Sequence, residues 1–177
     1  WEASGVLRRD GAPCYYAYEQ RFTVPGEDRT VTRRVFFARM RLSERAEGIV
    51  RPHEATLSAA KEDRLKLLRA TRTNVSPIFA MFADPQGVAS RILDSIASSP
   101  PTSTSSRRAS NATIADGRHR YETALNSLRE RTAAGTATED DRYLLTGLVA
   151  QEEPGLIVLP IHRLIRAGVV PSDLPSR

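Results

Sequence analysis

The sequence contains little cysteine, little histidine and almost no lysine. One cysteine among 177 residues, Cys14, excludes an intrachain disulfide and any metal site built from several cysteines. A chain without disulfides suits a reducing cytoplasm, and we expect a cytoplasmic protein. No apolar run approaches the ~18 residues that a membrane-spanning helix needs, so no membrane partner is expected.

The residues that are present describe an ordinary globular domain. Apolar residues make up 40% of the chain and charged residues 27%, which suits a single hydrophobic core. The net charge is +5, but 21 acidic residues are interleaved with 26 basic ones. A nucleic-acid partner is therefore not favoured, although it is not excluded. The first residue is Trp1 rather than Met, and we expect that elements of the native domain precede it.

The chain is organised around the stretch that surrounds Asp116-Gly117. A short β-branched and apolar run begins near Asn111 and stops at this pair. A strongly helical stretch, from Arg120 to about Ala134, follows without another breaker. The pattern predicts a strand, a tight turn and a helix.

This junction is a candidate anion site. The first N–H groups of a helix have no intrahelical partner, and the helix dipole favours negative charge there. Arg118, His119 and Arg120 add side-chain donors at the same end. The alternative is a plain sheet-to-helix turn with solvated arginines, and the residues alone do not decide between the two.

The remaining patterns predict an α+β fold with a mixed sheet, hairpins and flanking helices. We expect a hairpin of strands over 14–24 and 30–42, a helix over 61–73, a strand over 78–82, a helix from 88 and a second hairpin over 143–149 and 156–159. The organisation is then a first part over 1–97, a flexible Ser/Pro-rich loop over 98–111, a second part over 112–168 and a frayed tail over 169–177.

Tyr15, Tyr16 and Tyr18 lie in the first predicted strand. Aromatic residues on a half-buried strand usually belong to the core, and we expect these three to be buried. The alternative is a platform on which nucleic-acid bases stack.

The three histidines each lie beside a charged residue. His53 precedes Glu54, His119 lies between two arginines, and His162 precedes Arg163. A histidine next to a glutamate offers a possible acid, base or metal ligand, but the second histidine of a zinc-protease motif is absent. The residues form either one shared polar site or three unrelated surface positions, and the His53-Glu54 pair is equally compatible with a loop salt bridge.

A co-linear set of motifs resembles an uncharacterised prokaryotic family, domain of unknown function 1015. The resemblance covers about residues 1–97 and 112–165. The matching segments are Trp1…Gly5-Val6-Leu7, Tyr16-x-Tyr18-x-Gln20-x-Phe22, Pro52-His53-Glu54-x-Thr56, Glu62-Asp63-Arg64, Ser76-Pro77-Ile78-Phe79, Ile114-Ala115-Asp116-Gly117-x-His119-Arg120-Tyr121-Glu122-Thr123-Ala124-Leu125 and Leu159-Pro160-x-His162-Arg163.

The resemblance also implies a longer parent protein and a ParB/sulfiredoxin-like core. Asp116-Gly117-x-His119-Arg120 is similar to the nucleotide-phosphate motif of ParB proteins and archaeal free-serine kinases. In that superfamily the Gly–His–Arg segment holds phosphates. Two departures stand out: Arg118 replaces the histidine that the family usually carries, and Ser98–Ser110 replaces ordered sequence.

These observations lead to one main hypothesis and two alternatives. In the main hypothesis the chain binds ATP or ADP with magnesium and phosphorylates a small hydroxyl-bearing metabolite such as a free amino acid. Gly117, Arg118, His119 and Arg120 would bind phosphate, and Asp116 would hold the metal. The catalytic residues would be Glu54, Asp116 and His119, with Glu54 as the base. The alternatives are a ParB-like nucleotide switch or DNA-associated module, and an inactive fragment.

Overall fold

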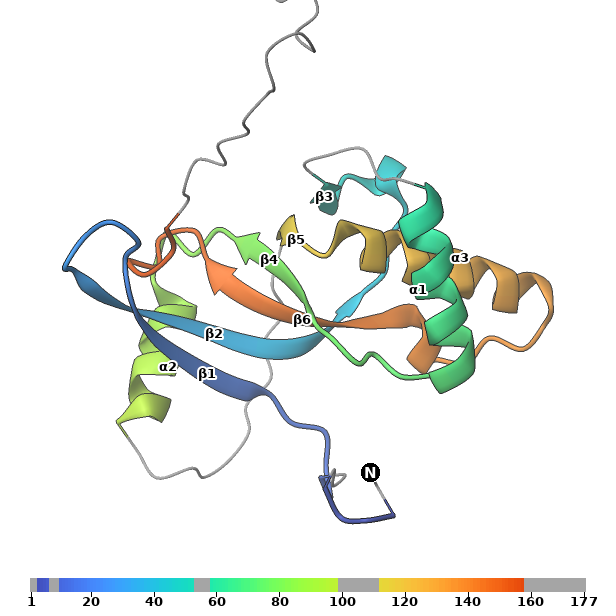
Figure 1. The fold of residues 1–177 in the computed structure, drawn as a ribbon, viewed down its shortest axis with the longest axis horizontal. Coiled ribbons are helices and arrows are strands. Elements are labelled where there is room, and N and C mark those ends of the chain that lie inside the picture. Colours follow the sequence, from blue (N-terminus) through green and yellow to red (C-terminus); the bar gives the residue numbers. More distant parts are fainter. Residues whose placement is uncertain (1–2, 7–9, 53–57, 99–111, 158–177) are drawn as a thin grey trace, which may run out of the picture.

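A computed structural model describes residues 3–6, 10–52, 58–98 and 112–157, and within them six strands form one mixed sheet (Figure 1). Their order across the sheet is β1-β2-β6-β4-β5-β3. The strands are β1 (Tyr16–Thr23), β2 (Thr30–Arg41), β3 (Val50–Pro52), β4 (Ile78–Phe82), β5 (Ala112–Asp116) and β6 (Tyr143–Ala150). The α+β fold is confirmed.

The pairing explains why the sheet is mixed. β1 and β2 form the predicted antiparallel hairpin, and β6 returns antiparallel to β2. β4 runs parallel to β6 and antiparallel to β5, and β3 runs parallel to β5 at the far edge. Parallel pairs need crossover connections, which the helices between the strands provide.

Three α-helices flank the sheet. α1 (Ser58–Thr71) and α3 (Arg118–Ala133) pack side by side at one end of the sheet, and α2 (Val88–Ala97) lies at the other end near β1 and β2 (Figure 1). α1 begins at Ser58 rather than at the predicted Lys61. α3 begins at Arg118 rather than Arg120, so all three basic residues of the motif belong to the helix.

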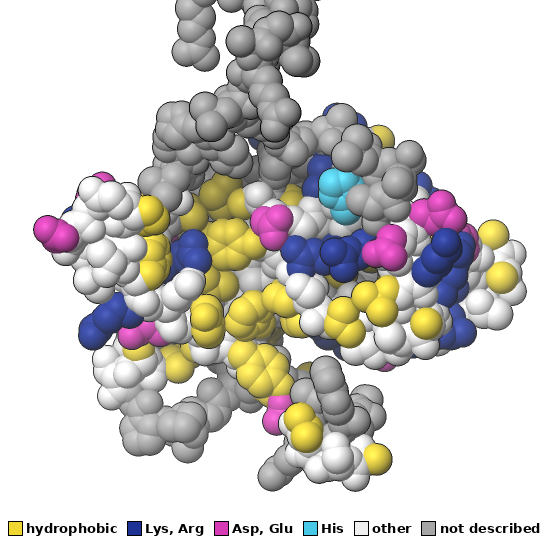
Figure 2. Space-filling model, in the orientation of Figure 1, with side chains coloured by type: hydrophobic (Ala, Val, Ile, Leu, Met, Phe, Trp, Pro, Cys, Tyr) yellow, Lys and Arg dark blue, Asp and Glu magenta, His cyan; other side chains and the backbone are white. Residues whose placement is uncertain are grey.

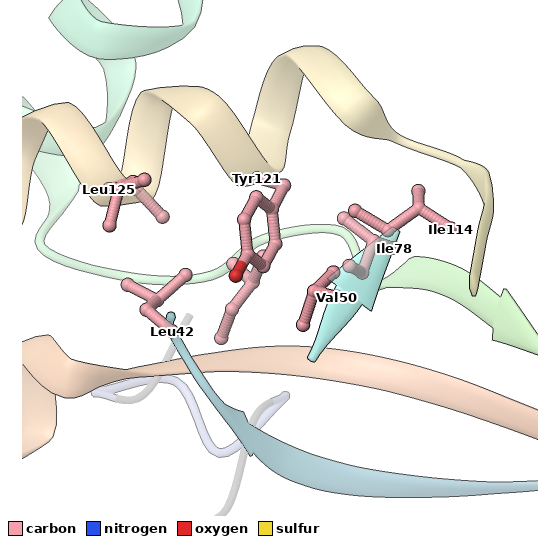
Figure 3. Packing of buried hydrophobic residues seen from close by; sticks show 8 residues of the cluster. Leu42, Val50, Ile78, Ile114, Tyr121 and Leu125 are labelled. Atoms are coloured by element: carbon pink, nitrogen blue, oxygen red, sulfur yellow. The ribbon is translucent and has the colours of Figure 1, made fainter. Parts of the chain in front are cut away.

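All three helices cover the same face of the sheet. On β2, Phe36, Ala38 and Met40 point to this face, because successive strand side chains alternate between faces. The core under α1 and α3 is formed by Leu42, Val50, Ile78, Ile114, Tyr121, Ala124, Leu125 and Leu144 (Figure 3). A second cluster under α2 is formed by Ala38, Ala80, Phe82, Leu148 and Ala150.

Tyr121 joins α3 to the chain that follows β2. Its ring points from α3 into the core beside Leu42 (Figure 3). Its hydroxyl donates to the Ser43 carbonyl oxygen at 2.9 Å and accepts from the Ser43 N–H at 2.9 Å. Both buried backbone groups are thereby satisfied, which removes a desolvation cost.

The prediction of a second hairpin is wrong. β6 forms as expected, but Leu156 and Ile157 are not in a strand. A strand has two edges, and those of β6 are taken by β2 and β4. The chain after β6 instead turns alongside β2, where Glu153 Oε1 accepts from the Arg34 N–H at 3.3 Å. No edge of β6 therefore remained for residues 156–159.

The burial expected for the tyrosines is also wrong. Tyr15, Tyr16 and Tyr18 are 42%, 51% and 46% exposed. β1 is an edge strand, so its only strand neighbour is β2, and no described helix covers its whole length. One neighbour is not enough to bury large rings.

Several predictions fall on residues outside the described ranges. These are the loop over 98–111 apart from Ser98, the tail over 169–177, and His53, Glu54, His162 and Arg163. In the part of the chain that is described, no helix has the length and apolarity required to cross a membrane.

Asp84 supplies a testable feature of the fold because it caps α2. The carboxylate is buried and accepts from the N–H groups of Val88, Ala89 and Ser90 at 2.8 to 3.2 Å. The preceding residue at the helix start, Gly87, has no side chain to do so. We expect Asp84→Ala to lower the free energy of unfolding by about 1–2 kcal/mol in urea titrations. Asp63→Ala, an exposed substitution on α1, serves as the control, and an equal loss in both variants would contradict the capping role.

Candidate functional site

The predicted strand–turn–helix is present at the end of β5. The strand ends at Asp116, Gly117 turns the chain with φ of +89°, and α3 begins at Arg118. Gly117 is required for two reasons. Its φ is one that other residues rarely adopt, and a Cβ here would lie 2.7 Å from Ile78 Cγ2. The turn therefore brings the start of α3 directly against β4.

The start of α3 offers backbone donors. Gly117 provides no capping side chain, and within the described residues no side chain accepts from the N–H of Arg118 or Arg120. Such groups, together with the helix dipole, favour an anion. His119 lies half-buried in the same turn.

Arg118 is held inside the fold. Its side chain is only 10% exposed, and its Nε donates to Glu122 Oε1 at 3.1 Å. The other oxygen of Glu122 accepts from Lys61 Nζ of α1 at 3.1 Å. This cluster, which we call the Arg118–Glu122–Lys61 bridge, ties α3 to α1. The primary partner of Arg118 in this fold is thus a carboxylate of its own chain.

Arg120 is also engaged, but closer to the surface. Its Nη1 donates to Ser76 Oγ and to the Pro77 carbonyl oxygen, both at 2.5 Å. Its Nη2 donates to Asp116 Oδ2 at 2.9 Å. The Asp116 side chain is 76% exposed, whereas that of Arg120 is 25% exposed. Arg120 thus links the segment before β4 to the end of β5, and its exposed partner is a carboxylate.

Arg118 and Arg120 make ion pairs within the chain instead of being fully solvated, and the choice between an anion site and a plain turn stays a prediction. The structure does bring Asp116, Gly117, Arg118, His119 and Arg120 to one end of α3. Sequence reasoning missed Glu122, Lys61 and Ser76. The spacing of four between Arg118 and Glu122 is a helical ion-pair signal that was available, but nothing local indicates Lys61 or Ser76.

The topology directs a second segment toward the same edge of the sheet. β3 runs parallel to β5, and Pro52 lies opposite Ile114. The carboxyl ends of adjacent parallel strands meet at one edge, where ligands bind in many α/β sheets. The chain therefore leaves β3 at the edge where Gly117 follows β5. His53 and Glu54 come next in the sequence, outside the described residues.

A shallow groove adjoins the motif, and Arg120 forms part of its wall. It lies between α1, α3 and the segment before β4. Polar groups at its wall come from Arg64, Asn74, Ser76 and Arg120, while Leu67, Leu68 and Leu144 supply apolar surface. Arg120 is thus shared between the start of α3 and this groove.

The described residues contain no group of three or more His, Cys, Asp or Glu side chains that could hold a metal ion. Asp116 is a single carboxylate, already paired with Arg120. One carboxylate suits magnesium only when substrate phosphates supply further ligands, which is how this ion commonly binds.

Fold and site together define an α+β domain with a mixed sheet and a glycine-initiated helix that presents backbone donors and basic residues. The sequence matches the family described as Protein of unknown function (DUF1015) over residues 1–112 and 107–174, and the chain belongs to this family. Comparison with curated proteins gave no match, and comparison with solved structures gave none either.

Proposed function

We propose that this chain binds a nucleotide phosphate at Gly117–Arg120 and transfers a phosphoryl group to a small hydroxyl-bearing metabolite. The observation that carries the proposal is the start of α3, where backbone N–H groups that no described side chain caps adjoin His119 and Arg120. Because the superfamily motif that this segment resembles holds phosphates, we assign the phosphate to the same position.

In the proposal, the Asp116 carboxylate occupies the position on Arg120 that a phosphate oxygen takes when nucleotide binds. This exposed carboxylate accepts from Arg120 Nη2, which is where a phosphate oxygen would accept. A magnesium ion that arrives with the nucleotide would draw Asp116 away and release this donor. Arg118 keeps its partner Glu122 and contributes positive potential rather than a direct contact.

In the reaction, the acceptor hydroxyl attacks the terminal phosphorus, the bond to the bridging oxygen breaks, and the shortened nucleotide leaves. Charge neutralisation and positioning carry most of such a step. Glu54 would take the hydroxyl proton. The direction in which β3 ends supports this role, since β3 leads toward the edge that holds the motif.

Titration calorimetry with ATP, ADP and CTP, each with and without magnesium, tests the proposal. Arg120→Gln is expected to weaken nucleotide binding by about tenfold or more, because a charge-assisted hydrogen bond is lost. Arg69→Gln is the matched control, since Arg69 pairs with Glu130 on an exposed part of α1 and α3. Silent titrations with all three nucleotides would reject the binding site.

Turnover tests the catalytic assignment separately. With serine and related alcohols as acceptors, Glu54→Gln and Asp116→Asn should abolish nucleotide consumption. In Asp116→Asn we also expect nucleotide binding to lose its dependence on magnesium. Undiminished turnover in both variants would remove these two residues from the mechanism while leaving the phosphate site intact.

A further inference from the structure

The sheet face opposite the helices is rich in aromatic rings. The register of β1 and β2 places Tyr16 opposite Phe37 and Tyr18 opposite Val35, on the face away from Phe36 and Ala38. Phe79 of β4 is aligned with Gly147 of β6, which in turn lies opposite Phe37. We call the surface formed by Tyr16, Tyr18, Phe22, Arg33, Phe37 and Phe79 the open face.

No described helix packs on the open face, and its rings remain accessible. Tyr16 is 51% and Tyr18 46% exposed, and the Tyr18 ring lies 5.7 Å from the Phe37 ring. Figure 2 shows hydrophobic side chains gathered over the middle of the sheet, where β2, β4 and β6 lie in Figure 1. A solvated sheet face is normally polar, so an aromatic one indicates a binding surface.

Arg33 gives the open face a positive charge that no described carboxylate pairs with. Its guanidinium carbon lies 5.5 Å from the centroid of the Phe22 ring and 5.2 Å from that of Phe79. Nη2 donates to Gln20 Oε1 at 2.5 Å, and the buried Nε finds no acceptor among the described residues. None of the ion pairs found among the described residues includes Arg33. A guanidinium that lies against two rings and forms no ion pair with a described residue is suited to an anion.

The charges around the open face favour a negatively charged partner. None of the residues that β1, β2, β4 and β6 direct to this face is acidic, whereas Arg33, Arg39 and Arg41 of β2 all point there. Among the described residues, three carboxylates at its margins each have a partner: Asp140 pairs with Arg39, Asp10 accepts from the Tyr16 hydroxyl, and Asp116 of β5, which lies opposite Phe79, pairs with Arg120. The hydrogen bond to Asp10 raises the pKa of Tyr16.

We propose that the open face binds single-stranded nucleic acid, with bases stacked on Tyr16 and Tyr18 and a phosphate at Arg33. The two tyrosines are about 6.8 Å apart along the strand, which provides two successive stacking positions. Accessible aromatic faces combined with arginines recognise unstacked bases and their phosphates, and a duplex hides the base faces that these rings need. This surface adjoins the nucleotide site at Phe79, which lies opposite Asp116, but the two tyrosines lie on β1 at the other edge of the sheet.

Fluorescence anisotropy of a labelled oligothymidylate, compared with the matching duplex, tests the inference on the whole chain. We expect preferential single-strand binding that weakens steeply with salt. The double variant Tyr16→Ser/Tyr18→Ser should lower the affinity by about tenfold or more. Arg33→Gln should also weaken binding and reduce the salt slope by about 0.7, the value for one phosphate contact on a single strand.

Matched controls come from the other face of the same hairpin. Tyr15 is similarly exposed, but its ring lies 6.4 Å from Phe36 on the side of the helices. Arg21 of β1 lies opposite Thr32 and points to that side as well. Tyr15→Ser and Arg21→Gln should change the affinity by less than about twofold. Circular dichroism melting confirms that each variant is folded.

Three results would overturn the inference: no oligonucleotide binding even at low salt, an equal loss in the controls, or an unchanged affinity in the double tyrosine variant. A second copy of the chain on this face is the competing occupant. Sedimentation equilibrium would reveal it as a dimer that the double tyrosine variant dissociates, in the absence of any oligonucleotide binding.

Discussion

Replacing Gly117 with alanine is expected to destabilise the protein by about 2–5 kcal/mol. Two costs add: a left-handed φ in a residue with a Cβ, and overpacking against a neighbour that cannot move. The added Cβ would lie 2.7 Å from Ile78 Cγ2 and 2.9 Å from Ile78 Cβ, and Ile78 is only 1% exposed. Urea denaturation followed by circular dichroism measures the loss.

Gly26→Ala separates the two costs. Gly26 has a similar φ of +82°, but a Cβ there meets nothing within 4 Å. This control should lose only the backbone contribution, about 1–2 kcal/mol. Equal losses at both positions would show that the contact between the turn and β4 is unimportant. If nucleotide binding is measured in parallel, we expect Gly117→Ala to reduce it even under conditions where the variant is folded, since the start of α3 must shift.

The second large effect is expected at the Arg118–Glu122–Lys61 bridge. Glu122→Gln keeps the shape of the side chain but removes the charge opposite Arg118, whose side chain is only 10% exposed. Breaking a buried ion pair on one side costs about 3–5 kcal/mol; Glu122 itself is 28% exposed, so we expect a smaller loss of about 2–3 kcal/mol. The free energy of unfolding in urea is the measurement.

Glu130→Gln is the matched control for Glu122. Glu130 also lies on α3 and also pairs with a basic residue of α1, Arg69, but the two side chains are 47% and 53% exposed. Surface pairs of this kind contribute at most about 1 kcal/mol. Similar losses in the two variants would mean that Arg118 is not dependent on Glu122, and Arg118 would then be available for a direct phosphate contact.

Local sequence signals predicted most of the secondary structure of this chain. The strand over Ile78–Phe82 is bounded by Pro77 and by a turn, and it appears with the expected limits. The hairpin of β1 and β2 and the helix from Val88 are confirmed as well. Each depends on residues that are close in the sequence, whose propensities and breakers act on the backbone directly.

The sequence predicted where the candidate site lies along the chain, but not which residues contact it. Asp116-Gly117 followed by basic residues marks the start of a helix in any fold. The partners of those residues come from elsewhere: Lys61 from α1 and Ser76 from the segment before β4. Contacts between segments so far apart in the sequence depend on packing, which no local pattern encodes.

The sequence by itself determined most of the elements, the turn at Gly117 and the family, because these follow from local backbone preferences and from a co-linear set of motifs. The tertiary structure decided three further points. It gave both edges of β6 to other strands, paired the arginines of the motif with carboxylates of the same chain, and left the tyrosines of β1 exposed on an edge strand. Each of these depends on which surfaces meet once the sheet is assembled, and strand order is set by the packing of the whole core.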